Sequence, residues 1–332
     1  MKIAISAVIA TYKRPHLLEG TLAALAAQKV TDPLGWEVVV VDNNSQDETG
    51  ATVAAFAKAV SIPVTCVLES RQGLSHARNR GIAAAQGSII AFIDDDVLPA
   101  PDWIAQVHQA IQRWDAHGVG GPILPRWEVT PPPTWLTSSR HLMDRLAIMD
   151  YPESCVLSYP MRGRPQVWGA NMAFRREVFE QVGRFDCERG IVGGKLYRGE
   201  EVELINRALQ HGCRIVYDPA ITVLHRIGRG RMCKSYFRKL EFDAAEGEVD
   251  VSRRGRFMLG APLWLYHAVL GAFWRWIIVA ASRRAEAFDQ QLDWIRYMGS
   301  FSGYLKADRR RAENAPPVVA ASRSGSSRAQ AE

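Results

Sequence analysis

The sequence has few cysteines and no closely spaced pair of them. Five cysteines are scattered over 332 residues, and no C-x-x-C pair occurs among Cys66, Cys155, Cys187, Cys213 and Cys233. This odd number and spacing exclude a disulfide framework and a C-x-x-C zinc cluster, and are typical of a reducing compartment. A secretory signal is also lacking, because residues 1–10 carry one lysine and no small-residue cleavage site follows a long apolar core. We therefore expect a cytoplasmic protein.

Glycine is missing after the first expected strand, where the sequence reads Ala10-Thr11-Tyr12-Lys13-Arg14-Pro15. A dinucleotide-dependent dehydrogenase needs G-x-G-x-x-G at this point, so that class is excluded. A nucleotidyltransferase would carry a glycine-rich basic loop there to bind phosphate. That class stays as an alternative only because it also combines an α/β sheet with acidic metal ligands.

Short apolar runs alternate with helical patterns over the first 125 residues. Near-continuous runs rich in Val and Ile predict strands buried on both faces of a parallel sheet, at residues 3–10, 37–41, 64–68 and 88–93. Helices are expected at 16–28, 46–59, 75–85 and 102–117, the second preceded by Ser45 and Glu48 at capping-box spacing. Repeated strand–helix–strand units predict an α/β fold whose ligand lies at the carboxyl ends of the strands.

The remaining sequence divides into less regular segments. Residues 126–165, which include Pro131–Pro133, predict an irregular functional loop or lid. Helices near 175–182 and 201–211 and a strand near 214–217 follow, and the chain has a helical pattern from about residue 261. We expect a catalytic domain at 1–235, a helical extension at 236–311 and a disordered tail at 312–332, which is rich in Ala, Ser, Arg and Pro.

The strongest single feature is an apolar strand that ends in three carboxylates, Asp94, Asp95 and Asp96. Three adjacent negative charges repel one another unless a cation or hydrogen-bond donors compensate them. Oxygen ligands of this type suit Mg²⁺ or Mn²⁺, which commonly bridge to substrate phosphates. The alternative is an acidic helix N-terminus, but capping needs one acid and not three.

Polar residues also follow two other expected strands. Asp42 ends the run Val38–Val41, and it can either accept hydrogen bonds from a nucleoside or form a turn. Thr11, Tyr12 and Arg14 follow the first strand. Three strand ends therefore deliver polar groups to one rim of the sheet.

Several motifs, in this order and spacing, resemble the family 2 glycosyltransferases of the GT-A fold. They are Val8-Ile9-Ala10-Thr11-Tyr12-Lys13-Arg14-Pro15, Val40-Val41-Asp42-Asn43-Asn44-Ser45, Ala77-Arg78-Asn79-Arg80-Gly81, Phe92-Ile93-Asp94-Asp95-Asp96, Gly169-Ala170-Asn171-Met172-Ala173-Phe174-Arg175-Arg176, Val182-Gly183-Arg184-Phe185-Asp186, Gly199-Glu200-Glu201 and Val223-Leu224-His225. The resemblance covers roughly the first 230 residues. It implies a Rossmann-like, mostly parallel central sheet and inverting transfer from a nucleotide-diphosphate-sugar, with a lean to UDP-sugars.

The resemblance also implies roles for individual residues. Asp96, with Asp94 and His225, would bind Mn²⁺ or Mg²⁺, and Arg78, Asp94 and Asp95 would contact the donor phosphates or nucleoside. Thr11, Tyr12, Arg14 and Asp42 would hold the nucleoside, and Trp168, Gly169 and Asn171 would line the sugar or acceptor cavity.

The general base in the family is the second acid of a Glu-Asp pair that opens a helix. Here the pair is Glu200-Glu201, so Glu201 is the candidate base and its side chain is one methylene longer. The alternative reading is two acids favoured by the helix dipole. Arg226, Arg229 and Arg231, interleaved with glycines, either stabilise the leaving diphosphate or are plain surface charge.

Residues 262–281 form an apolar stretch about long enough to cross a bilayer. Arg275 near its centre argues against a span, whereas Trp264, Trp274 and Trp276 and the flanking arginines suit the surface of an anionic membrane. The alternatives are a helix packed on the catalytic domain or in a dimer interface. Net charge is +6, and the basic C-terminal third suits such a membrane, a phosphorylated substrate or plain solvent exposure.

The sequence as a whole predicts a metal-dependent glycosyltransferase that acts on a glycan or lipid-linked acceptor. We expect no nucleic-acid partner, and the membrane contact would place the enzyme at the inner face of the plasma membrane. A non-catalytic glycosyltransferase-like scaffold is the other alternative. It would tend to have lost Asp96, Glu201 or His225, and all three positions carry competent groups.

Overall fold

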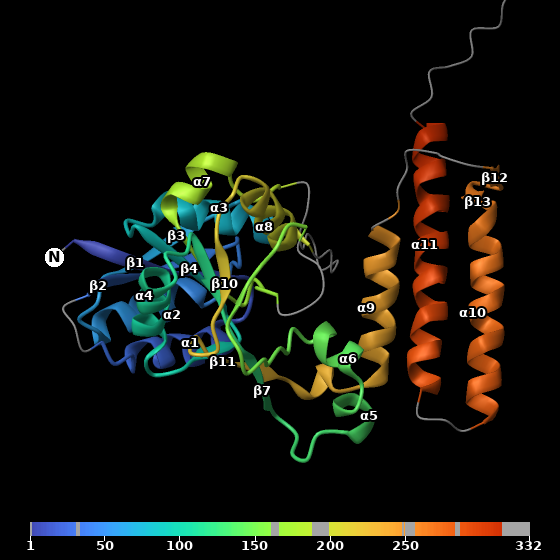
Figure 1. Ribbon diagram of the computed structural model, residues 1–332, viewed down its shortest axis with the longest axis horizontal. Coiled ribbons are helices and arrows are strands. Elements are labelled where there is room, and N and C mark those ends of the chain that lie inside the picture. Colours follow the sequence, from blue (N-terminus) through green and yellow to red (C-terminus); the bar gives the residue numbers. More distant parts are fainter. Residues whose placement is uncertain are drawn as a thin grey trace, which may run out of the picture. The chain divides into compact units, whose positions relative to one another are not determined.

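The computed structural model describes residues 2–30, 34–160, 166–187, 199–247, 249, 256–282 and 286–313. The chain divides into two compact units, residues 1–244 and residues 245–332. The first unit contains the central sheet, and the second contains a helical hairpin (Figure 1). The expected disordered tail lies, from residue 314 onward, outside the described residues.

The first unit is built on an eight-stranded sheet in the order β3-β2-β1-β4-β9-β6-β10-β8. Its strands are β1 (Ile3–Thr11), β2 (Gly35–Asp42), β3 (Val64–Leu68), β4 (Ile89–Asp94), β6 (Gly118–Gly120), β8 (Cys155–Val156), β9 (Asn171–Arg175) and β10 (Ile215–Tyr217). The first four strands are parallel to one another, as their near-continuous apolar runs predict. β9 is antiparallel to both β4 and β6, so the sheet is mixed beyond β4.

Helices cover both faces of this sheet (Figure 1). They are α1 (Pro15–Ala26), α2 (Thr49–Ala59), α3 (Leu74–Ala84), α4 (Trp103–Arg113), α7 (Arg176–Val182) and α8 (Glu200–Gln210). On one face, Val8, Val39 and Phe92 of the strands pack with α3, α7 and α8 into one buried apolar cluster. Alternate residues of β1 and β2, such as Ile9 and Val40, are buried as well. Burial on both faces explains why these strands are apolar throughout.

A second, three-stranded sheet connects distant parts of the chain. It contains β5 (Val97–Pro99), β7 (Ile123–Trp127) and β11 (Val223–Ile227), with β11 between the other two. β11 is followed by a short 3-10 helix, η1 (Arg229–Arg231), and by α9 (Lys234–Gly247). Since β5 follows the acidic triplet directly, its pairing with β11 brings His225 close to Asp96.

Two local predictions are wrong. The capping box of Ser45 and Glu48 does not form: the hydroxyl of Ser45 accepts from the backbone N–H of Lys13, and Asp47 accepts from the N–H of Thr49 where α2 begins. The expected irregular segment 126–165 contains two short helices, α5 (Thr134–Thr137) and α6 (Arg140–Arg145), as well as β8. Glu241 of α9 is buried and pairs with His141 and Arg145 of α6, which ties this segment to the domain.

The second unit is a hairpin of α10 (Leu263–Ala281) and α11 (Ala287–Glu313), preceded by β12 (Phe257–Met258) and β13 (Ala261–Pro262). Trp276 of α10 stacks on Trp294 of α11 with ring centroids 5.2 Å apart, and Tyr266 packs edge-on against Phe301. Trp276 is therefore part of the helix–helix contact and does not face outward as the sequence indicated.

Candidate active site

The ends of three neighbouring strands lie at one rim of the central sheet. In the strand register, Thr11 of β1 pairs with Asp42 of β2, and Ala10 pairs with Asp94 of β4. Parallel strands carry their carboxyl ends at the same edge, where α/β sheets bind their ligands. The structure thus brings Thr11, Asp42 and the acidic triplet together, as the sequence indicated.

Asp95 is buried and fixed by its neighbours. Its carboxylate accepts a hydrogen bond from the Thr11 hydroxyl at 2.7 Å and lies 3.4 Å from a guanidinium nitrogen of Arg14. The Thr21 hydroxyl donates to its backbone carbonyl at 2.9 Å. Burial, together with the charge of Asp96, raises the pKa of Asp95 to about 7. Thr11 and Arg14 therefore hold an acid that would otherwise be costly to ionise.

Asp96, His225 and Arg231 form a close cluster. His225 Nε2 lies 3.4 Å from Asp96 Oδ1, and Arg231 Nη1 lies 3.3 Å from Asp96 Oδ2 and 3.0 Å from His225 Nε2. The guanidinium can only donate, so a neutral His225 with its proton on Nδ1 accepts from Arg231 through Nε2, whereas a protonated His225 donates from Nε2 to Asp96. Burial opposes ionisation of Asp96, but His225 and Arg231 hold its pKa well below the usual range. When His225 is neutral, a carboxylate and an imidazole lone pair therefore point at one cationic group.

Arg78 connects the acidic triplet to α8. Its guanidinium is buried and lies 3.5 Å from Asp94 Oδ1 and 2.9 Å from Glu200 Oε1, across 122 residues of sequence. Gly169 makes room for it, because a Cβ at that position would lie 2.2 Å from Arg78 Nη2. In the structure, Arg78 thus joins the acidic triplet to α8, and Gly169 leaves room for its guanidinium. The sequence indicated donor contact for Arg78 and cavity lining for Gly169.

Glu201 is the second residue of α8 and is buried. Its Oε2 atom has no hydrogen-bond partner in the described structure. Burial, together with the charge of Glu200, raises its pKa to about 7, although Arg78 acts in the opposite direction. A carboxylate that has a free oxygen and titrates near neutral pH has the properties of a general base.

The site carries more negative than positive charge. Five carboxylates face three guanidinium groups among the described residues, namely Asp94, Asp95, Asp96, Glu200 and Glu201 against Arg14, Arg78 and Arg231. If all are ionised and His225 is neutral, an excess of two negative charges is left. Buried charge of this kind needs a compensating cation or protons.

Four predicted site residues have contacts or degrees of exposure that the sequence did not indicate. Asn171 is buried and its amide accepts from the Trp103 indole and donates to the carbonyls of Pro122 and Ile221, so its amide is used in structural contacts. Asp42 Oδ1 closes a turn by accepting from the Ser45 N–H. Tyr12 is 42% exposed, with the Lys13 ammonium above its ring, and Trp168 is half-buried.

Sequence reasoning did not place Arg231 in the cluster with Asp96 and His225. The pattern Arg226-Ile227-Gly228-Arg229-Gly230-Arg231 indicates a basic, glycine-containing loop, but it does not show which arginine turns inward. Only the pairing of β11 with β5 decides this, because it aligns His225 with Val97 and lets the Arg226 N–H donate to the Asp96 carbonyl.

Comparison with known proteins identifies the family. A family model described as glycosyl transferase family 2 matches residues 6–183. The chain is 28% identical to the glucosyl-dolichyl phosphate glucuronosyltransferase of Haloferax volcanii over 229 residues, which are 67% of this chain and 69% of that protein. It is 24% identical to the succinoglycan biosynthesis protein ExoM of Rhizobium meliloti over 242 residues, which are 72% of each chain.

Solved structures show the same fold at low sequence identity. The mannosyltransferase PcManGT from Pyrobaculum calidifontis, in complex with GDP-Man and Mn²⁺, aligns with a TM-score of 0.56 and 19% identity, covering 94% of this chain and 87% of that one. TarS of S. aureus (residues 1–349) in complex with UDP aligns with a TM-score of 0.52 and 14% identity, covering 93% and 92%. These matches confirm the GT-A fold. The chain belongs to the family 2 glycosyltransferases and is a glycosyltransferase.

Proposed function

We propose that this enzyme transfers a sugar, with inversion, from a nucleotide-diphosphate donor to a hydroxyl of a glycan or lipid-linked acceptor. The Arg78 bridge carries this proposal, because it joins Asp94 at the strand rim to Glu200, the residue before the candidate base. The strand rim, where we propose that the nucleotide binds, is thereby linked to the pair of acids that contains the candidate base. Relatives and neighbours support it by name: one acts on a dolichyl phosphate, and two structures hold GDP-Man and UDP.

In the proposed reaction, the acceptor oxygen forms a bond to the anomeric carbon while the bond from that carbon to the diphosphate oxygen breaks. The acceptor proton moves to the free Oε2 of Glu201. The Oε2 atoms of both Glu200 and Glu201 lack a hydrogen-bond partner in the described structure, but Glu200 is ion-paired to Arg78 through Oε1, whereas the pKa of Glu201 is raised to about 7. Attack and departure on opposite sides of the carbon give inversion.

We further propose that Asp96 and His225 bind a divalent cation. Carboxylate and neutral imidazole suit Mn²⁺, and the two ligand atoms face one point that the Arg231 guanidinium fills. No group of three or more protein ligands occurs in the described part of the chain, so such an ion would share the donor diphosphate and water. The ion would neutralise the excess charge of the rim and the charge on the leaving group. Arg231 would have to leave its place as the ion enters.

A thermal-shift screen of UDP, GDP and their sugars, with and without Mn²⁺ and Mg²⁺, tests the donor and the metal. We expect the matching nucleotide with its metal, at about 100 times its Kd, to stabilise the protein by about 2.7 kcal/mol. For a domain of this size that is a rise in Tm of about 5–10 °C. The same screen identifies the nucleotide base, and we expect uridine nucleotides to raise the Tm more than guanosine nucleotides. Absence of any shift with every nucleotide and metal would contradict the donor proposal.

We also propose that the second unit contacts an anionic membrane surface. α10 is long and apolar enough to cross a membrane by length and composition, and only 11% of it is buried. Its outer side exposes Trp264, Leu270, Trp274 and Ile278, and Trp274 is 61% exposed. Arg275 is also exposed next to this apolar stripe, which favours a helix lying on the membrane over one crossing it.

Flotation with liposomes tests this contact. We expect the full chain to float with vesicles that contain anionic lipid, and the triple variant Leu270→Ser, Trp274→Ser, Ile278→Ser to bind at least about tenfold more weakly, since each large apolar side chain contributes about 1.5–3 kcal/mol when fully buried. A matched control, Leu68→Ser with Val156→Ser, alters exposed apolar residues of the first unit. Equal flotation of both variants, or none for the unaltered chain, would overturn the membrane proposal.

A further inference from the structure

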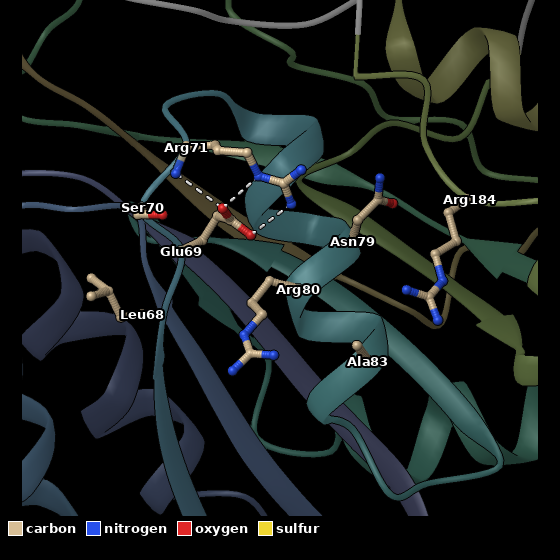
Figure 2. Close-up of a pocket in the computed structure, with 8 residues that line it drawn as sticks. All are labelled: Leu68, Glu69, Ser70, Arg71, Asn79, Arg80, Ala83 and Arg184. Atoms are coloured by element: carbon tan, nitrogen blue, oxygen red, sulfur yellow. Dashed lines mark hydrogen bonds and ion pairs between the residues drawn. The ribbon is translucent and has the colours of Figure 1, made fainter.

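A second polar cavity lies in the first unit, at the end of β3. Its volume is 440 Å³, and it is bounded by the end of β3, the outer side of α3 and Arg184. Figure 2 shows Arg71 turned toward the carboxylate of Glu69, Arg80 beneath that pair and Arg184 on the far side of Asn79. Small-molecule sites have volumes of about 300–1,000 Å³, so the cavity can hold a monosaccharide with a charged substituent.

The cavity has unbalanced positive charge. Glu69 is buried, and Arg71 satisfies it through its Nε at 3.0 Å, its Nη2 at 3.3 Å and its backbone N–H at 3.0 Å. The guanidinium groups of Arg80 and Arg184 have no hydrogen-bond or ion-pair partner within the described ranges. Two guanidinium groups, those of Arg80 and Arg184, therefore line a cavity whose one carboxylate is already paired with Arg71. This arrangement suits a phosphate or carboxylate group.

The walls of the cavity are held in place independently of any ligand. The Asn43 amide donates to the carbonyls of Glu69 and Arg71 and accepts from the Gly73 N–H. On the other side, the Asn79 amide and the backbone of Phe185 exchange two hydrogen bonds, of 2.8 and 3.0 Å. Binding here needs little ordering of the backbone, which lowers its entropic cost.

α3 lies between the cavity and the acidic triplet, while the β3 wall of the cavity adjoins the rim at Asp42, which pairs with Leu68. Arg78 is buried and faces Asp94 and Glu200, whereas its neighbours Asn79 and Arg80 line the cavity. A helix with its side chains is about 10–12 Å across. A group bound at Arg80 and Arg184 therefore lies on the opposite side of α3 from Asp94 and is not the donor diphosphate at Asp96.

We propose that Arg80 and Arg184 bind an anionic group, a phosphate or carboxylate, on a part of the acceptor other than the sugar whose hydroxyl attacks. This inference rests on the proposed function, since it assumes an acceptor that extends beyond the reacting hydroxyl. The exposed side chain of Leu68, which also lines the cavity, offers an apolar surface for the sugar that carries the charge.

Binding of three probes to the full chain tests this site: glucose 1-phosphate, glucuronate and neutral methyl glucoside, measured by calorimetry or ligand-observed NMR. We expect the two anionic probes, or one of them, to bind more tightly than the neutral one. The double variant Arg80→Gln, Arg184→Gln should weaken that binding about tenfold or more, because hydrogen bonds to charged groups are the strong ones. Which anionic probe binds distinguishes phosphate from carboxylate.

Lys58→Gln is the matched control, because Lys58 is an exposed cation on α2, outside the cavity. Arg71 is left unaltered, since replacing its side chain would leave buried Glu69 without its cationic partner. The proposal would be overturned if the anionic probes bound no more tightly than methyl glucoside. Equal binding of these probes by the double variant and by Lys58→Gln would overturn it as well. So would loss of the nucleotide thermal shift in the double variant, because the cavity would then belong to the donor. A persistent nucleotide shift with no probe binding would leave the proposed function standing without this subsite.

Discussion

Replacing Glu201 by Gln is expected to lower kcat by about 10²–10⁴-fold, the usual contribution of a general base. The amide has nearly the same shape as the carboxylate but cannot accept the acceptor proton. The thermal shift by nucleotide and metal should persist, because Glu201 makes no recorded bond to Asp94, Asp95 or Asp96. Initial rates at saturating donor, together with the nucleotide thermal shift, measure both effects on one preparation.

The pH dependence of the unaltered enzyme gives a second view of the same group. Because burial and the charge of Glu200 raise the pKa of Glu201 to about 7, the base is protonated and inactive below that pH. Activity should therefore fall about tenfold per pH unit below about 7 and level off above it. Glu200 and Arg78 are the charged neighbours that set this value.

Glu201→Asp is the conservative control, since it keeps the charge and shortens the side chain by one methylene. It should retain more activity than the Gln variant and keep an acidic limb in its pH profile. A Gln variant with full activity would contradict the base assignment, and one that also loses nucleotide binding would assign Glu201 to the donor site. A Glu201→Asp variant as inactive as Gln would show that reach, and not charge alone, matters here.

The part of the fold that the sequence predicts well is the parallel half of the sheet. β1 to β4 are apolar on both faces and are separated by helices of ordinary length, so their bounds differ from the predicted ones by at most two residues. The rim follows from them, because parallel register places Thr11, Asp42 and Asp94 at one edge. Local pattern is sufficient wherever neighbours in sequence are also neighbours in the sheet.

The pattern is insufficient where distant segments pair. β6 (Gly118–Gly120) is too short for any periodicity to show. A strand is expected near 214–217, where β10 lies, but its pairing with β6 is fixed by the sheet around it. Asn171 illustrates the consequence for the site. Its position in a family motif indicated the sugar cavity, but the convergence of Trp103, Pro122 and Ile221 uses its whole amide.

The ion pairs that assemble the active site are likewise not readable from sequence. Arg78 meets Glu200 across 122 residues, and Arg231 meets Asp96 across 135. The charges are visible in the sequence, but their partners depend on how α8 and β11 dock. Family resemblance indicated which residues to expect at this site, and the structure shows the neighbours that shift the pKa values of Asp95, Asp96 and Glu201.

Asp96→Asn is expected to abolish the metal-dependent part of nucleotide binding. Even outer-shell partners of metal ligands are worth about 10–100-fold in affinity, so loss of a direct anionic ligand should weaken Mn²⁺ binding by about 100-fold or more. Titration of free Mn²⁺ by electron paramagnetic resonance, with and without nucleotide, measures this without any need for turnover. Unchanged Mn²⁺ affinity in Asp96→Asn would exclude Asp96 as a ligand.

Arg231→Met should change the same titration in the opposite direction. In the protein alone, Arg231 Nη1 lies 3.0–3.3 Å from the two atoms that would bind the ion, so metal entry must break both contacts. Hydrogen bonds to charged groups are worth about 1.5–3 kcal/mol, and about 1.4 kcal/mol is tenfold in affinity. Methionine keeps the length and removes the charge, so Mn²⁺ alone should bind about tenfold more tightly.

Arg229→Met is the matched control, since Arg229 lies on the same 3-10 helix and its contacts among the described residues, with Glu128 and Met232, are made by its backbone. If Arg231→Met binds Mn²⁺ no better than this control, the ion does not compete with the guanidinium. If Arg231→Met binds Mn²⁺ more tightly than the control and yet transfers sugar more slowly, Arg231 has two roles. It would hold the site in the absence of metal, and its displaced charge would assist the departure of the diphosphate once the ion has taken its place.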